Sequence, residues 1–253
     1  MMDSKYIHTD KDDNAGLIAF TGRHGTGKTT MIEHFAATNP FPDVKVHVAR
    51  SQAKNVHNGY GVCIQDPLSY EKRLTIQEDI LSSWISEIRK CLDRCDPDYK
   101  NIILTDRSPV DIAAYLLVDY TRGISKDLED RTQIFVDTAL KCAKKRIITS
   151  HIYYRYTFDI QERDFANIFN TTYLAIHNRM LRKLHEDQGM THVLSRIIAA
   201  ESFQYSFMDD GLEPDTDMCS FIFNKRYMEL LSTIQRVFYP NLTWLMDYNS
   251  SKS

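Results

Sequence analysis

The sequence has few of the features that mark membrane, secreted or general nucleic-acid-binding proteins. No apolar run approaches membrane-spanning length, and the polar, acidic N-terminus has no apolar signal region. The five cysteines form no C-x-x-C pair, and none of the nine histidines has metal-ligand spacing with another. A net charge of −3 argues against a broad basic surface for nucleic acid. These absences predict a cytoplasmic protein with reduced thiols, no membrane partner and no metal beyond one that a ligand brings.

The composition and length indicate one α/β domain with an appended helical piece. Hydrophobic residues make up 43% of the 253 residues and charged residues 26%, which is enough for a substantial core. The sequence has no internal repeat and no low-complexity tract. We expect a flexible arm over residues 1–15, a core over residues 16–200, and a C-terminal extension over residues 201–253 that packs on the core.

The strongest pattern in the sequence is LIAFTGRHGTGKTT, residues 17–30, which contains the P-loop motif G-x-x-x-x-G-K-[ST]. Glycines allow backbone N–H groups to surround a phosphate, and the following helix adds its N-terminal N–H groups. We expect Lys28 to reach the β- and γ-phosphates of ATP and the Thr29 hydroxyl to hold Mg²⁺. The predicted ATP-binding residues are Gly22, Arg23, His24, Gly25, Thr26, Gly27, Lys28, Thr29 and Thr30.

Apolar strand-like runs alternate with amphipathic helical stretches along the chain. The expected strands are the run before the P-loop and residues 44–49, 101–105 and 146–154, and the expected helices follow the P-loop and cover residues 75–95, 109–120, 126–145 and 165–184. Residues 51–70 are polar, with two glycines, and we expect a long loop there. A fifth strand fits residues 191–194 or 242–246. The pattern predicts a three-layer P-loop NTPase fold: a five-stranded parallel sheet covered by helices, with a helical lid and a C-terminal helical extension.

In such folds, ligands bind at the carboxyl ends of the strands, so the residues after each strand are candidates for a site. Asp106 ends an apolar strand in the manner of a Walker B segment, and its carboxylate could support Mg²⁺ or accept a proton from a substrate hydroxyl. Arg107 could bind a phosphate or carboxylate of the acceptor, because its planar guanidinium suits such groups. Arg50 follows the second strand at the same predicted edge.

For other polar residues near these strand ends, a structural role is at least as well supported by the sequence as a catalytic or binding role. Ser108, Pro109 and Asp111 form a helix start, so we interpret Ser108 and Asp111 as a cap. Tyr115 fits the core as well as a site wall. The charged segment 154–164 could bring Arg155 and Arg163 onto a transferred phosphate as a lid, or it could be a solvated loop.

Taken in order, these pieces resemble the P-loop kinases of nucleosides and nucleotides. The element TDRSPVDIAAY, residues 105–115, is similar to the D-R-x-x-x-D-x-x-A-Y element of thymidylate-kinase-like enzymes, and most of all to the AAA-type domain that phosphorylates ribosylnicotinamide and its viral and bacterial relatives. The resemblance covers about residues 16–195 and admits a phage-encoded member, which would act in the host cytoplasm. It implies that Asp106 and Arg107 handle Mg²⁺ and the acceptor, that Arg50 closes the acceptor site, and that Arg163 belongs to the lid.

One departure from the family pattern concerns the base for the acceptor hydroxyl. Deoxynucleoside kinases carry a glutamate near the end of the second strand, whereas residues 47–52 here contain no carboxylate. Either Asp106 is the base, or the acceptor is already a phosphate and needs little help from a base. A third reading is a phage kinase that phosphorylates the hydroxymethyl group of 5-hydroxymethyluridine in DNA.

The leading hypothesis is an ATP- and Mg²⁺-dependent kinase that transfers the γ-phosphate to a nucleoside- or nucleotide-type acceptor, as a monomer or a homodimer. Its expected catalytic residues are Lys28, Asp106, Arg107 and Arg163, its acceptor-binding residues are Arg50, Arg107, Tyr115 and Arg155, and its Mg²⁺ ligands are Thr29 and Asp106. A P-loop ATPase or regulatory nucleotide-binding module, with water as acceptor, is the alternative of another class.

Overall fold

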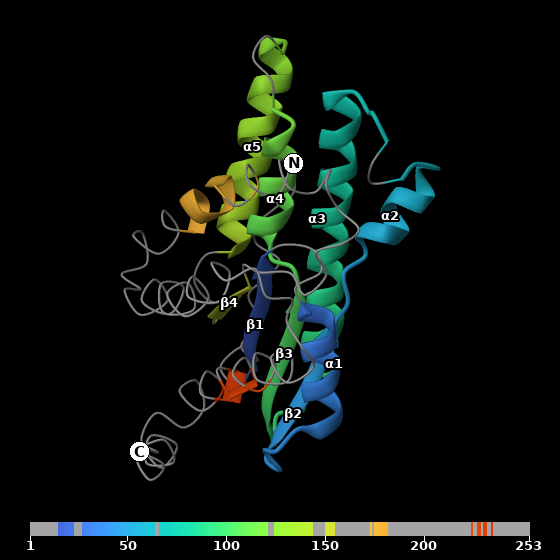
Figure 1. Cartoon of the computed structure of the whole chain (residues 1–253). Coiled ribbons are helices and arrows are strands. Elements are labelled where there is room, and N and C mark those ends of the chain that lie inside the picture. The colour runs from blue at the N-terminus through green and yellow to red at the C-terminus, as the bar shows by residue number, and fades with distance from the viewer. Residues whose placement is uncertain are drawn as a thin grey trace, which may run out of the picture.

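Four parallel strands form one sheet in the computed structural model (Figure 1). The structure describes residues 15–22, 27–63, 66–120, 124–143, 150–154, 173, 175–181, 224, 227, 228, 230, 231 and 234. The strands are β1 (Ala15–Gly22), β2 (Val44–Ala49), β3 (Lys100–Asp106) and β4 (Ser150–Tyr154). Their order in the sheet is β2-β3-β1-β4, so the P-loop strand β1 lies between β3 and β4.

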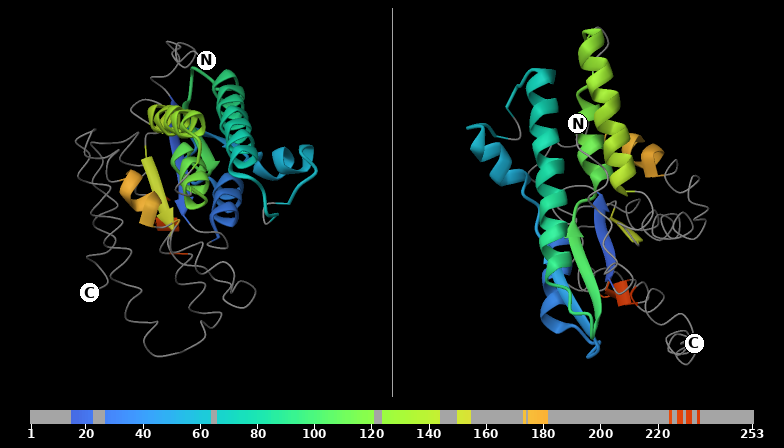
Figure 2. Two further views of the ribbon diagram at one scale, coloured as in Figure 1. Left: turned by 90° about the horizontal axis from the view of Figure 1, so that it is seen from above. Right: turned by 180° about the vertical axis from the view of Figure 1, so that it is seen from behind.

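Helices cover both faces of this sheet. They are α1 (Lys28–Thr38), α2 (Ala53–Gly59), α3 (Tyr70–Asp93), α4 (Pro109–Val118) and α5 (Lys126–Ala143). Figures 1 and 2 show α3, α4 and α5 side by side, extending past the end of the sheet at which β3 leads into α4. No helix in the described part of the chain is both long enough and apolar enough to cross a membrane.

Side-chain alternation along β1 divides the core into two clusters, because successive residues of a strand point to opposite faces. Leu17 and Ala19 belong to the cluster with α3, α4 and α5. Ile18 and Phe20 belong to the cluster with α1. Residues from the C-terminal region complete this second cluster: Tyr227, Leu230, Leu231 and Ile234.

Two of the helix starts follow from local sequence. The Ser69 hydroxyl accepts a hydrogen bond from the Lys72 N–H at the start of α3. The Ser108 and Asp111 side chains form a reciprocal capping box at the start of α4, with Pro109 at its first position. Both helix starts are therefore specified within a few residues of sequence.

The predicted parallel α/β fold is confirmed, with one difference in its parts. Residues 51–70 do not form one long loop, because Ala53–Gly59 is the helix α2. The helix α2 is stabilised by tertiary contacts, because His57 is buried and Val56 packs against the core. The described residues contain four strands, and both candidates for a fifth strand, residues 191–194 and 242–246, lie outside them. The predicted arm (residues 1–15) and charged lid segment (residues 154–164) also lie outside the described residues, except that Ala15 begins β1 and Tyr154 ends β4.

Candidate active site at the carboxyl edge of the sheet

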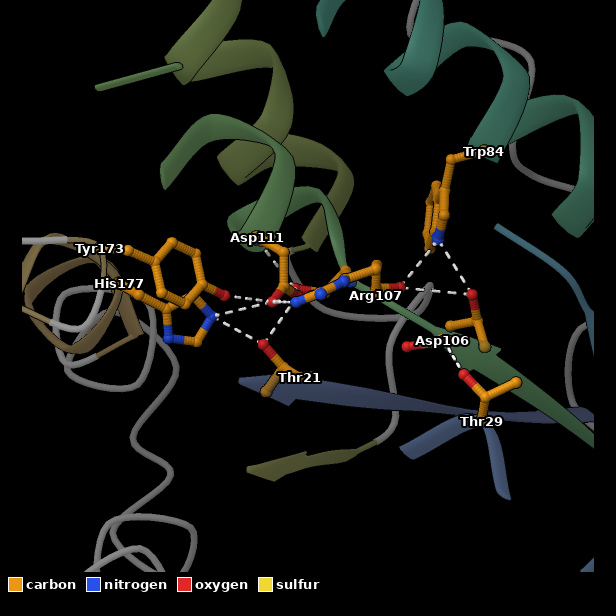
Figure 3. Close-up of polar contacts among 10 residues, drawn as sticks. Thr21, Thr29, Trp84, Asp106, Arg107, Asp111, Tyr173 and His177 are labelled. Atoms are coloured by element: carbon orange, nitrogen blue, oxygen red, sulfur yellow. Dashed lines mark hydrogen bonds and ion pairs between the residues drawn. The ribbon is translucent and has the colours of Figure 1, made fainter. Parts of the chain in front are cut away.

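The start of α1 contacts the end of β3. Gly27 has a left-handed backbone (φ 78°), which favours glycine at this turn into the helix. Lys28 follows it and is buried. The next residue, Thr29, donates a hydrogen bond from its hydroxyl to Asp106 Oδ2 at 2.5 Å (Figure 3). The P-loop helix and the Walker B-like strand therefore meet directly.

The second carboxylate oxygen of Asp106 is suited to a cation. Asp106 Oδ1 is buried and has no hydrogen-bond partner among the residues that the structure describes. Mg²⁺ prefers hard oxygen ligands, and it commonly binds through one or two carboxylates together with phosphates and water. The Thr29 hydroxyl and the Asp106 carboxylate fit that donor set.

Arg107 has an unusual backbone conformation at the end of β3. Its φ is 96°, a region that residues with a Cβ rarely adopt. Its N–H donates to the Phe20 carbonyl of β1 at 2.9 Å. Its carbonyl accepts a hydrogen bond from the Trp84 indole of α3 at 3.1 Å. Both backbone polar groups of Arg107 are thus held by neighbouring elements.

The Arg107 side chain lies in a mostly buried position, with 13% of it exposed. Its guanidinium is 3.4 Å from Asp111 Oδ1, one helical turn further along the chain. It also lies 5.1 Å from the centre of the Tyr115 ring, within the range of a cation–π contact. The left-handed turn therefore directs Arg107 toward α4.

Asp111 is fully buried and is the centre of a polar cluster, which we call the Asp111 cluster: Thr21, Arg107, Ser108, Asp111, Tyr173 and His177. Its carboxylate accepts hydrogen bonds from the hydroxyls of Thr21 (2.6 Å) and Tyr173 (2.5 Å). It also accepts the N–H of Ser108 at 2.7 Å and the Ser108 hydroxyl at 2.8 Å. Figure 3 shows Thr21, Tyr173 and His177 converging on Asp111.

The charge state of the cluster follows from these contacts. Burial alone would raise the pKa of Asp111, but the electrostatic influence of His177 and of the charged Arg107, together with hydrogen bonds from Thr21 and Tyr173, outweighs burial and holds that pKa below its usual range. Burial lowers the pKa of His177 to about 4, against the opposing effect of Asp111. At neutral pH, the cluster therefore holds a carboxylate and a neutral imidazole.

The hydrogen bonds also assign the proton on the imidazole. Thr21 has one hydroxyl hydrogen, and it donates this hydrogen to Asp111. His177 Nε2 lies 2.6 Å from the same hydroxyl oxygen. The Thr21 oxygen must then be the acceptor, so the neutral His177 carries its proton on Nε2.

Tyr173 and His177 lie beside Tyr115 and Arg107. The Tyr173 ring stacks on the Tyr115 ring with a centroid distance of 4.6 Å and an interplanar angle of 20°. The centre of the His177 ring lies 5.2 Å from the centre of the Tyr173 ring. Tyr115 consequently contacts both Arg107 and Tyr173, which makes it part of the wall around the guanidinium.

The predicted site residues fall into three groups. One group meets at the carboxyl edge: Gly22, Gly27, Lys28, Thr29, Thr30, Asp106, Arg107 and Tyr115. Arg50 is also at a strand end, but its side chain is 75% exposed and pairs with Glu33 of α1 at 3.7 Å. A third group lies outside the described residues: Arg23, His24, Gly25, Thr26, Arg155 and Arg163.

Sequence reasoning missed several residues of this site. It interpreted Asp111 as a helix cap only, and the structure shows that Asp111 is both a cap and the centre of the buried cluster. It placed Tyr173 on an apolar helix face and gave no role to Thr21, Trp84 or His177. The usable signals were the i,i+4 spacing of Arg107 and Asp111 and the need of a buried indole N–H for an acceptor.

Comparison with known protein families identifies the family of this chain. A family model described as an AAA domain matches residues 17–169. Comparison with curated proteins gives no match.

Solved structures similar to the chain include the NadR protein and two thymidylate kinases. The NadR protein in complex with NR has a TM-score of 0.49 and 13% identity over 72% of this chain and 45% of that chain. Thymidylate kinase from Ehrlichia chaffeensis has a TM-score of 0.39 and 17% identity, over 74% of this chain and 98% of that chain. Thymidylate kinase from Candida albicans has a TM-score of 0.38 and 11% identity, over 66% and 77%. The chain spans less than half of the NadR structure.

Proposed function

The chain belongs to the AAA domain family, and from that premise we propose that it is an ATP- and Mg²⁺-dependent kinase of a nucleoside- or nucleotide-type acceptor. One observation carries the proposal: Thr29 of the P-loop helix is hydrogen-bonded to Asp106, and the next residue, Arg107, is held in place beside it. A simple nucleotide-binding module needs no such arginine, whereas a phosphotransferase needs a cation for its acceptor or for the charge on the transferred group.

The donor half of the site would consist of the P-loop and Asp106. Lys28 would bind the β- and γ-phosphates, with its buried position limiting its freedom to move. Thr29 and Asp106 would hold Mg²⁺, which, when bound, would neutralise charge on the phosphates. Asp106 could also accept the proton of an acceptor hydroxyl, and for a phosphate acceptor that help would be unnecessary.

The acceptor half would be built around Arg107. Its guanidinium would bind and orient the acceptor, and Tyr115 would line the same side. We propose Arg50 as a residue that reaches the acceptor only when the site closes, because its exposed side chain pairs with Glu33 in this structure. Arg155 and Arg163 would act from the lid segment during the same closure.

An experiment with γ-labelled ATP distinguishes the candidate acceptors. The purified protein is incubated with labelled ATP and Mg²⁺ and with nucleosides, nucleoside monophosphates, unmodified DNA or DNA that contains 5-hydroxymethyluridine. We expect label on a nucleoside or a monophosphate. Label only on the modified DNA would establish the DNA-kinase alternative instead, and label released only as free phosphate, whatever the acceptor, would leave an ATPase and reject the kinase.

A variant and a matched control test whether the P-loop binds the phosphates of ATP. Lys28→Ala should lower transfer by at least about a hundredfold, because it removes a charge that stabilises the transferred phosphate. Lys54→Ala, which changes an exposed lysine of α2, is the matched control and should keep normal activity. Circular dichroism and thermal unfolding confirm that both variants fold. Near-normal transfer by Lys28→Ala would mean that residues 22–29 do not form the donor site.

A further inference from the structure

The indole of Trp84 reaches from α3 to the end of β3, where it contacts the backbone of Arg107 (Figure 3). We propose that Trp84 is a positioning residue: it holds the Arg107 backbone in the left-handed conformation that directs the guanidinium into the site. The functional part of this inference rests on the proposed function, in which Arg107 binds the acceptor. The backbone part can be tested without any substrate.

Arg107 is the one residue with a Cβ that has a positive φ in the part of the chain that the structure describes. The other positive values, 78° and 65°, belong to Gly27 and Gly61. A left-handed backbone is unfavourable for a residue with a Cβ, and it persists only where surrounding contacts hold it. The question is therefore which contacts hold Arg107.

The Arg107 N–H donates to the Phe20 carbonyl at 2.9 Å, and the other backbone contacts are hydrogen bonds to the Arg107 carbonyl. The Trp84 Nε1–H donates both to this carbonyl (3.1 Å) and to the Thr105 hydroxyl oxygen (3.1 Å). The Thr105 hydroxyl in turn donates to the Arg107 carbonyl at 3.3 Å. We call these three groups the Trp84 latch: the Trp84 indole, the Thr105 hydroxyl and the Arg107 carbonyl. Trp84 is 5% exposed and Thr105 is fully buried, so water does not compete for these bonds.

The latch determines where the Arg107 side chain points. In an extended strand, Asp106 and Arg107 would point to opposite faces of the sheet. The left-handed turn instead brings Arg107 to 3.4 Å from Asp111 of the next helix while Asp106 remains on Thr29. Without the latch, the backbone can relax to a negative φ, and the guanidinium then leaves this position although none of its own contacts was mutated.

A stability experiment tests the latch. Arg107→Ala and Arg107→Gly both delete the guanidinium, but only glycine adopts a positive φ without strain. In the Trp84 background, Arg107→Gly should melt about 2–4 °C higher than Arg107→Ala. In the Trp84→Phe background, which removes the N–H donor and keeps a buried ring, this difference should fall to near zero. An equal difference in both backgrounds would overturn the proposal, and if Trp84→Phe does not fold, Thr105→Val takes its place in the same comparison.

A kinetic experiment tests the positioning role. Trp84→Phe with Arg107 intact should lower kcat/KM for the acceptor about three- to tenfold and leave the KM for ATP unchanged. Ile88→Val, one turn along α3 in the same buried cluster, is the matched control: it should lower the melting temperature without changing either kinetic parameter. If Trp84→Phe changed the KM for ATP as much as it changed kcat/KM for the acceptor, Trp84 would only pack in the core, and the positioning role would be refuted. If the unmodified protein transfers no phosphate, the proposed function fails, and the melting comparison alone decides the latch.

Discussion

Replacement of Asp111 by asparagine tests how much the protein depends on the Asp111 cluster. The change keeps the size of the side chain and removes its negative charge. Arg107, with 13% of its side chain exposed, then loses its buried counter-ion. The new amide group also places two N–H donors among hydroxyls that donated to the carboxylate, so some donors lose their acceptor.

The expected loss of stability follows from these two effects. Removal of one partner of a buried ion pair costs about 3–5 kcal/mol, because the other charge remains buried without compensation. Each hydrogen bond to a charged group is worth about 1.5–3 kcal/mol, but the two effects share the same atoms and cannot be added. We expect Asp111→Asn to lower the free energy of unfolding by about 3–5 kcal/mol, which corresponds to roughly 10 °C in melting temperature for a chain of this size.

The measurement is denaturant unfolding at neutral pH, with Asp119→Asn as the matched control. Asp119 is at the other end of α4, is partly exposed and pairs with Arg73 at 3.3 Å, so its replacement should cost less than about 1 kcal/mol. The pKa of Asp111 lies below its usual range, so its contribution is present above about pH 4 and is lost at lower pH. A loss no larger than that of Asp119→Asn would refute the central position that we give to Asp111.

Two further predictions concern the metal and the imidazole. Thr29→Val removes the hydroxyl that donates a hydrogen bond to Asp106. Calorimetry should then show that the Mg²⁺ concentration needed for half-maximal ATP binding rises at least about tenfold, and Thr29→Ser should restore the original concentration. An unchanged Mg²⁺ titration would contradict the assignment of Thr29 as a Mg²⁺ ligand. The pKa of His177 is lowered to about 4 in the folded protein, so the unfolded chain binds an extra proton between that value and the ordinary 6.5. The free energy of unfolding should therefore fall as the pH decreases through this interval, by at most about 1.4 kcal/mol per pH unit. His177→Gln should flatten this pH dependence. An identical slope in the variant would exclude His177 as the source of the dependence.

The parts of the fold with local signals were predictable from the sequence. Val44–Ala49 alternates over its whole length and forms β2 with those bounds. The start of α4 is specified by Ser108, Pro109 and Asp111, all within four consecutive residues. The P-loop motif together with the element at residues 105–115 gave the resemblance to the AAA-type domain, which the family match over residues 17–169 confirms.

The parts of the site that depend on contacts between distant residues were not predictable. Tyr173 bonds Asp111 across 62 positions, and nothing in its apolar helical pattern indicates that its hydroxyl faces a carboxylate. The Trp84 indole was one member of an amphipathic stripe, and only the tertiary structure supplies its acceptors. Arg50 shows the opposite case: topology placed it at a strand end, but the direction of its side chain depends on Glu33.

The five residues Arg107 to Asp111 show why the cap and the candidate site cannot be separated. Asp111 caps α4 through the Ser108 N–H, and the same carboxylate contacts the guanidinium that precedes the cap. The helix can start at Pro109 only if the chain turns sharply after Asp106, and the left-handed conformation of Arg107 makes that turn. A change that relaxed Arg107 would therefore move the helix start as well as the guanidinium. Because α4 in turn packs against α3 and α5, the orientation of a single strand-end arginine is stabilised by the packing of the whole helical layer.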